Sequence, residues 1–320
     1  MQRLPARELT ASSLFVYPLA VFIAGNLLFD HIGKPFSDHA LQATGSIAKG
    51  GNPNEVITDG LVWAATAHAY LIISLVMMLY LARWAWLRMR AAGTKINLYV
   101  AAALASLGIG YLAYADHNAR PVRAIFRFTY QSVAGSELTG KSQIQDFLNY
   151  TLTTINLISV IAPALLIALA PLLVREPIRG WTERELIMRV KETQVLGLMT
   201  SAFMVAGVLH MYAWMSWAPE ILNKKGLETV VGGVTFFWGS VFTTMLAAFY
   251  LPALFILQKH SEVVMDAQQI PLIERDQWLQ QRGLSLRIIN QLPQAIGILA
   301  PLIATPAGQL LANLGKLAPK

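Results

Sequence analysis

The sequence contains no cysteine among its 320 residues. This absence excludes disulfide bonds, thiolate metal sites, iron–sulfur clusters and cysteine nucleophiles, because each of them needs a cysteine sulfur. It does not identify the compartment, since a protein of an oxidising space needs no cysteine.

Charged residues are also scarce. They make up 13% of the chain, whereas soluble domains carry about 25%, and the mean hydropathy is +0.48. These values indicate a membrane protein. The net charge is +7, which in a soluble protein would suggest nucleic-acid binding. Here the basic residues lie at the ends of apolar segments, where membrane topology accounts for them, so we expect no nucleic-acid partner.

Apolar segments long enough to be transmembrane helices run through residues 1–258. At about 1.5 Å per residue, each crosses or nearly crosses a hydrocarbon core about 30 Å thick. Lipid offers no partner to a peptide group, so these segments must be helical. The six segments are 12–29, 61–85, 98–115, 151–174, 194–217 and 233–257. The predicted fold class is therefore all-α, a polytopic helical membrane protein whose first helix is a retained signal anchor.

Lysine and arginine residues predict the orientation of these helices. With the N-terminus in the cytoplasm, 17 of the 25 basic residues lie on the cytoplasmic side and 8 lie outside. This favours a bacterial inner (plasma) membrane with both termini cytoplasmic and with loops 30–60 and 116–150 facing outward. In the connection 175–193, Thr182 is predicted to cap a helix, with Glu185 three residues on. Residues 259–291 are predicted to form a cytoplasmic polar helical segment.

The C-terminal segment 292–320 is apolar again but is interrupted by Pro293, Pro301 and Pro306. Three interpretations remain open: a re-entrant element, a surface-lying element or a seventh span. If the segment crosses the membrane, the basic residues still favour the same orientation.

Two patterns in the predicted helices concern packing. Ala102, Ser106 and Gly110 form a stripe of small residues that lets another helix approach closely. Tryptophans near the predicted outer ends are typical of an aromatic belt at the membrane interface. They are Trp63, Trp214, Trp217 and Trp238.

His68 and His210 are the candidate site residues. Asp, Glu, Lys and Arg are absent from the interiors of the predicted spans, where only these two histidines are ionisable. Each lies about 10 Å below the predicted outer surface, so the two could hold a b-type haem axially. The alternatives are a proton or substrate relay, or ordinary hydrogen bonding to a neighbouring helix or water.

The basic triplet Arg120, Arg123 and Arg127 follows a helical spacing of i, i+3 and i+7 on the outward side. These arginines suit headgroup phosphates on an interfacial amphipathic helix. Alternatively, they receive haem propionates or form an anion-gathering rim above a pathway.

Three Asp-His dipeptides also fall on the predicted outward side. We interpret them as solvated loop residues and predict no metal site, because adjacent side chains rarely point together and no helical ligand spacing supports them. They are Asp30-His31, Asp38-His39 and Asp116-His117.

No catalytic centre is predicted, since phosphate-binding loops, nucleophile elbows and zinc-hydrolase motifs are absent. We expect a non-enzymatic channel, pore, or small-solute permeation or membrane-effector protein, without a cofactor and acting as a homo-oligomer or with a membrane-protein partner. The hydroxyl groups of Ser240, Thr243 and Thr244 are candidates to line a pore. Missing buried carboxylates argue against a proton- or sodium-driven carrier. The alternatives are a haem-binding redox subunit and a membrane assembly or immunity partner without transport.

Overall fold

The computed structural model describes residues 6–32, 53–88, 94–117, 121–135, 143–177, 180–222, 226–282 and 292–316. Within these ranges the chain is built of helices, and no strand occurs. Six helices are long and apolar enough to cross a membrane. The predicted all-α membrane fold is therefore confirmed.

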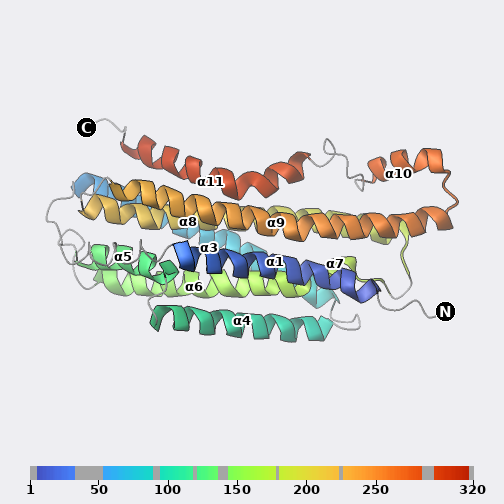
Figure 1. The fold of residues 1–320 in the computed structure, drawn as a ribbon, viewed down its shortest axis with the longest axis horizontal. Helices are drawn as coiled ribbons and strands as arrows, with labels where there is room; N and C mark the ends of the chain where they lie inside the picture. Colours follow the sequence, from blue (N-terminus) through green and yellow to red (C-terminus); the bar gives the residue numbers. More distant parts are fainter. Residues whose placement is uncertain are drawn as a thin grey trace.

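The long helices alternate in direction along the bundle (Figure 1). We call the end where α1 begins the near end, and the end where α1 finishes the far end. The six long helices are α1 (Ala6–Ile32), α3 (Pro53–Arg88), α4 (Thr94–His117), α6 (Gln143–Leu169), α8 (Glu183–Leu222) and α9 (Gly226–Ala267). The remaining elements are α5 (Pro121–Gly135), α7 (Pro171–Val174), the 3-10 turn η2 (Leu272–Glu274), α10 (Arg275–Gln281) and α11 (Leu292–Lys316).

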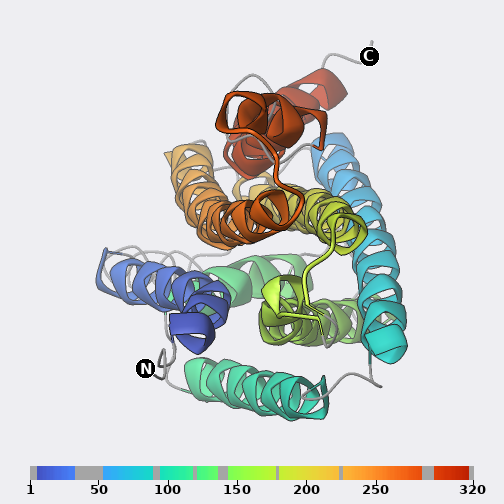
Figure 2. The same cartoon turned by 90° about the vertical axis from the view of Figure 1, so that its right-hand side faces the viewer.

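Viewed end-on, the helices form layers (Figure 2). Helices α8 and α9 pack together in the middle, α11 covers them on one side, and α1 and α6 lie on the other. Helix α3 closes one flank against α8 and α6, while α4 is outermost and packs against α6. The centre of the bundle thus lies among α1, α3, α6, α8 and α9.

Helix α8 begins where its sequence predicts. Its first residue is Glu183, and the backbone N–H of Glu185 donates a hydrogen bond to Thr182 Oγ1 at 3.2 Å. This confirms the predicted cap, which satisfies one of the free N–H groups in the first helical turn. The helix then runs for 40 residues, about 60 Å, and so extends beyond a hydrocarbon core.

Charged residues concentrate at the near end. Arg88 on α3 donates hydrogen bonds to both carboxylate oxygens of Glu192, at 2.7 and 2.6 Å. Arg189 donates to Glu185 at 2.8 Å and to the Leu172 carbonyl at 2.7 Å. This network ties α3, α7 and α8 together and satisfies a carbonyl that the short helix α7 leaves free.

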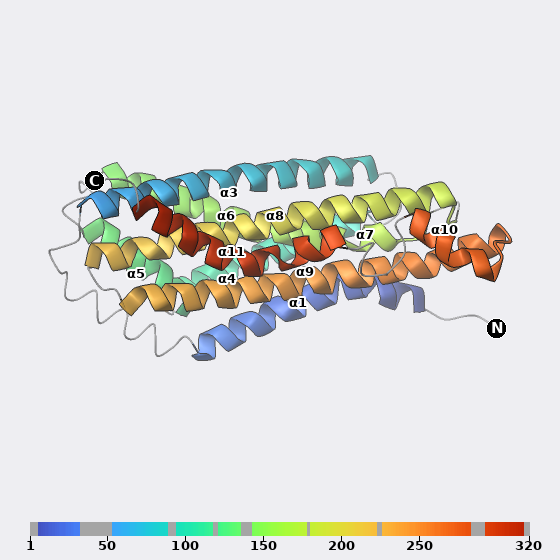
Figure 3. The same ribbon diagram turned by 90° about the horizontal axis from the view of Figure 1, so that it is seen from above.

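The apolar C-terminal segment forms one continuous helix, α11, with Pro301 and Pro306 inside it. It does not turn back on itself, and it runs lengthwise over α8 and α9 toward the far end (Figure 3). A small residue permits this approach, because a Cβ at Gly239 would lie 2.7 Å from the Pro301 carbonyl oxygen. Helix α11 therefore ends at the opposite end of the bundle from the start of α1.

Candidate functional site

His210 lies on the face of α8 that packs against α3, and it is 3% exposed. Its ring stacks on Tyr70 with centroids 5.8 Å apart and contacts Trp63 at 6.2 Å. Neither Nδ1 nor Nε2 has a hydrogen-bond partner among the described residues. A buried imidazole without partners is unusual, because nearly all buried polar groups are paired.

Three buried tryptophans continue from this histidine toward the far end. The Trp63 ring lies 5.3 Å from Trp214 and 5.7 Å from Trp217, centroid to centroid. All three indole N–H groups lack a partner within the described part of the chain. We call Trp63, Tyr70, His210, Trp214 and Trp217 the aromatic cluster. The sequence predicts an aromatic belt for these tryptophans at the membrane interface. In the structure, their rings are buried and fill the contact between α3 and α8.

Small residues let these rings fit between the two helices. A Cβ at Gly60 would lie 2.8 Å from the ring of Trp217, and one at Gly207 would lie 3.4 Å from the ring of Tyr70. Glycine at each position leaves room for the ring on the facing helix. Trp63, Ala67 and Tyr70 recur at intervals of four and three, so they share one face of α3.

The hydroxyl group of Tyr70, unlike the ring nitrogens of the cluster, is satisfied. It shares a hydrogen bond with Ser159 Oγ on α6 at 2.9 Å. Ser74 Oγ donates to the Tyr70 carbonyl at 2.5 Å. The bond to Ser159 holds the phenol ring and thereby the surface on which the imidazole rests.

The two candidate histidines lie in different environments. His68 is exposed on the outer surface of α3, whereas His210 is enclosed between α3 and α8. The structure therefore does not bring the two imidazoles to a common space. A haem held by both residues would require α3 to turn or the cluster to repack.

The arginine triplet falls on or next to α5. Arg120 lies outside the described residues, and Arg123 and Arg127 belong to α5, with Arg127 exposed. Helix α5 does not lie on the periphery, since Phe128 packs with Ala218 at the far end of α8. The side of α5 that carries Phe128 is thus held against the bundle end, while Arg127 is exposed.

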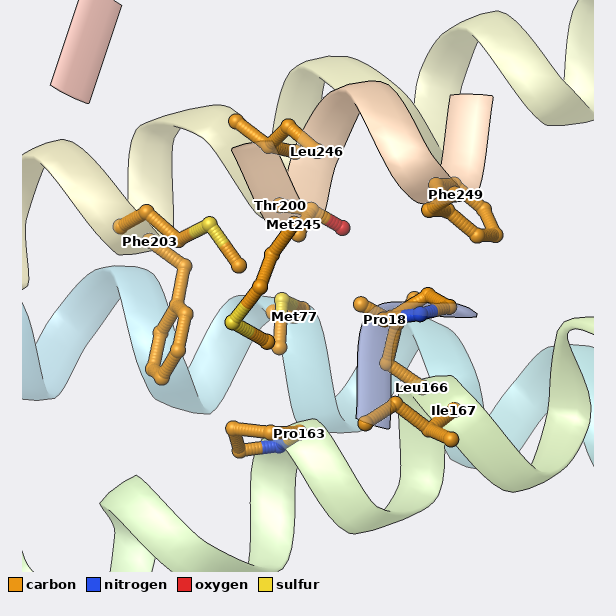
Figure 4. Close-up of a pocket in the computed structure, with 11 residues that line it drawn as sticks. Pro18, Met77, Pro163, Leu166, Ile167, Thr200, Phe203, Met245, Leu246 and Phe249 are labelled. Atoms are coloured by element: carbon orange, nitrogen blue, oxygen red, sulfur yellow. The ribbon is translucent and has the colours of Figure 1, made fainter. Parts of the chain in front are cut away.

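The centre of the bundle is apolar (Figure 4). A cavity of about 20 Å³ there is lined by side chains such as Met77, Phe203 and Met245, and this volume holds about one water molecule. The hydroxyl group of Thr200, also at the cavity, donates to the Leu196 carbonyl at 2.7 Å. The described side chains of one copy therefore present no hydrated passage at this level.

Two of the three hydroxyl groups proposed to line a pore bond to their own helix. Ser240 donates to the Phe236 carbonyl and Thr244 donates to the Ser240 carbonyl, both at 2.9 Å. Thr243 Oγ1 is buried without a partner among the described residues. The bonds of Ser240 and Thr244 are the usual way in which a hydroxyl group is satisfied inside a transmembrane helix.

A larger cavity of about 200 Å³ lies between α8, α9 and α11. It is lined mainly by apolar side chains together with Gln194 and Tyr250. This lining suits an acyl chain better than a hydrated solute.

Two of the three Asp-His pairs belong to described helices. Asp30 and His31 lie in the last turn of α1, Asp116 and His117 end α4, and Asp38-His39 lies outside the described residues. Among the residues that the structure describes, no group of three or more His, Asp or Glu side chains could hold a metal ion.

Comparison of the chain with protein-family models, with curated proteins and with solved structures finds no match.

Proposed function

We propose that the protein is a small-solute permeation protein of a bacterial inner membrane, acting as a homo-oligomer whose path runs between copies. One observation supports this most directly: no described part of the chain covers the small-residue stripe of α4. Ala102, Ser106 and Gly110 are all exposed, and a Cβ added at Gly110 would meet no atom within 4 Å.

The position of α4 supports an association through this stripe. Helix α4 is outermost in the bundle and packs chiefly on α6 (Figure 2). In lipid, helices associate where small residues let their backbones come close. A second copy of α4 is a natural occupant, and two copies would place their small faces together around a two-fold axis.

The apolar centre of one copy supports a path between copies. A solute that crosses must keep hydrogen-bonding partners, and the central cavity offers none beyond a satisfied threonine hydroxyl. Between copies, the exposed Ser106 hydroxyl group would provide such a partner.

We place the near end in the cytoplasm and the far end outside. The distribution of lysine and arginine supports this orientation. With α11 as a seventh crossing, residues after Lys316 lie outside. The expectation of two cytoplasmic termini applies only if α11 stays on the near side.

Cysteine substitution tests the interface cleanly, because the chain has no cysteine of its own. Gly110→Cys should give a disulfide-linked dimer on mild oxidation of native membranes. Leu79→Cys on α3, which is 62% exposed and away from the stripe, is the matched control and should stay monomeric. Monomers in both variants would refute the interface.

Flux measurements test the activity itself. Proteoliposomes with the unmodified protein should release small solutes, and Gly110→Trp should reduce release by about tenfold through a blocked interface. The control Gly233→Trp places the same ring at an open position on α9 and should leave release unchanged. Absence of release with the unmodified protein would end the permeation proposal.

A redox subunit is the second candidate, because the lone-pair nitrogen of the buried His210 has no partner among the described residues and is available to a metal. Purified protein would then show a Soret band that Gln substitution of His210 removes. A third candidate, an assembly or immunity partner without transport, predicts that Gly110→Cys crosslinks to a different membrane protein.

A further inference from the structure

The aromatic cluster has many hydrogen-bond donors and few acceptors. An indole offers one N–H donor and no acceptor, while a neutral imidazole offers one donor and one acceptor. Trp63, Trp214, Trp217 and His210 thus provide four donors and a single acceptor nitrogen, and none of these groups has a hydrogen-bond partner within the described ranges. The only site where the cluster can accept a proton is His210.

Protonation would make this arrangement untenable. It converts the remaining acceptor into a fifth donor and adds a full charge at a side chain that is 3% exposed. The rings of Tyr70 and Trp63 offer only their faces to the cation, a weak compensation compared with a counter-ion or water. The imidazolium can persist only if water reaches it.

No residue in the described ranges brings a counter-ion into contact with His210, since neither ring nitrogen has a partner there. On the packed elements, the following charged and titratable groups lie beside His210 or between it and the far end. They are Glu55, Asp59 and Tyr70 on α3, Tyr212 and Glu220 on α8, Arg127 and Tyr130 on α5, Asp146 and Tyr150 on α6, Glu228 on α9, and none on α11 between Ala295 and Ala304.

Asp59 is the acidic group nearest to the cluster along α3. It is buried and lies four residues before Trp63, on the same face of the helix. A proton arriving from the far end would therefore meet Asp59 before it reaches His210.

We propose that His210 is a proton-binding site, and that proton uptake separates the far halves of α3 and α8 and admits water from the far end. Water would supply acceptors for the imidazolium and for the three indoles at once. With neutral His210 the rings of α3 and α8 stay in contact, and protonation of His210 separates them. This inference does not depend on the proposed permeation activity.

Tryptophan fluorescence tests the opening in the full-length protein in lipid nanodiscs. Five tryptophans outside the cluster are first replaced by phenylalanine, so that emission reports the cluster alone. They are Trp84, Trp86, Trp181, Trp238 and Trp278. Between about pH 7.5 and about pH 4.5, the acrylamide quenching constant should rise reversibly by about twofold or more.

Two histidine variants separate a specific response from a general effect of acid. His210→Gln keeps a polar side chain but takes up no proton, so its quenching constant should not change with pH. His68→Gln, at the exposed histidine on the same pair of helices, should respond like the parent. A response that persists in His210→Gln, or that is missing from the parent, would overturn the inference.

A second measurement keeps all eight tryptophans, in case the five phenylalanine replacements impair folding. With ¹³C-labelled histidine, six imidazole signals are expected, and the one absent from His210→Gln belongs to His210. Its titration midpoint should coincide with the midpoint of a pH-dependent change in emission. A His210 signal that stays constant over this pH range would refute proton uptake.

Discussion

The imidazole of His210 stacks on the phenol ring of Tyr70 across the contact between α3 and α8, with the ring planes inclined by 18°. The Tyr70 ring is held from behind by Ser159 of α6. This relationship links three helices through one buried titratable group. The stability of the contact should therefore depend both on ring packing and on the small residues that permit it.

Gly60→Ala should destabilise the protein by about 1–3 kcal/mol, because overpacking forces neighbouring groups to shift. The added Cβ would lie 2.8 Å from the ring of Trp217. Thermal unfolding followed by circular dichroism in detergent measures the effect. Gly233→Ala on α9 is the control, since its Cβ meets nothing within 4 Å, and it should be neutral or slightly stabilising. Equal melting temperatures for the two variants would contradict the prediction.

The Arg88–Glu192 pair should contribute measurably to the stability of the near end. Both side chains are half-buried and joined by two short bonds, so a double-mutant cycle with methionine at each position should give a coupling of about 1–3 kcal/mol.

The ion pair between Arg275 and Asp266 is the comparison for this cycle. Asp266 has a side chain that is 65% exposed, and exposed pairs contribute about 0–1 kcal/mol because water and salt screen them. Similar couplings for the two pairs would show that burial does not strengthen the Arg88–Glu192 interaction.

Gly239→Val should loosen the docking of α11. The first atom of the new side chain would lie 2.7 Å from the Pro301 carbonyl oxygen, and backbone cannot yield as a flexible side chain does. Limited proteolysis should then cut the C-terminal segment several-fold faster than in the parent, whereas Gly233→Val should leave the rate unchanged. Unaltered protection in Gly239→Val would show that α11 docks elsewhere.

Reporter fusions should place the two termini on opposite sides of the membrane. Helix α11 has 25 residues, about 38 Å of helix, which suffices to cross a hydrocarbon core. A reporter active only outside the cytoplasm should be active after Lys320 and inactive before Met1. Cytoplasmic location of both reporters would support the prediction from the charge distribution and would keep α11 on the near side.

The position of each long helix could be predicted from the sequence, but its burial could not. Trp63 and Trp214 were predicted to lie in an interfacial belt, since tryptophan is common there, yet both are buried. The spacing of His210, Trp214 and Trp217 by four and three residues was the available signal, because such residues share a helix face. For α4 the predicted small stripe exists, but nothing in the sequence shows that it stays exposed.

The sequence by itself determined that the chain is a bundle of membrane helices, because scarce charge and long apolar segments leave no other way to satisfy the backbone in lipid. Only the tertiary structure decided that His210 is enclosed and His68 is exposed. The physical reason is that a helix facing lipid on one side and protein on the other is apolar all round. Its sequence periodicity therefore does not distinguish the two sides. Which side is buried depends on where the neighbouring helices pack.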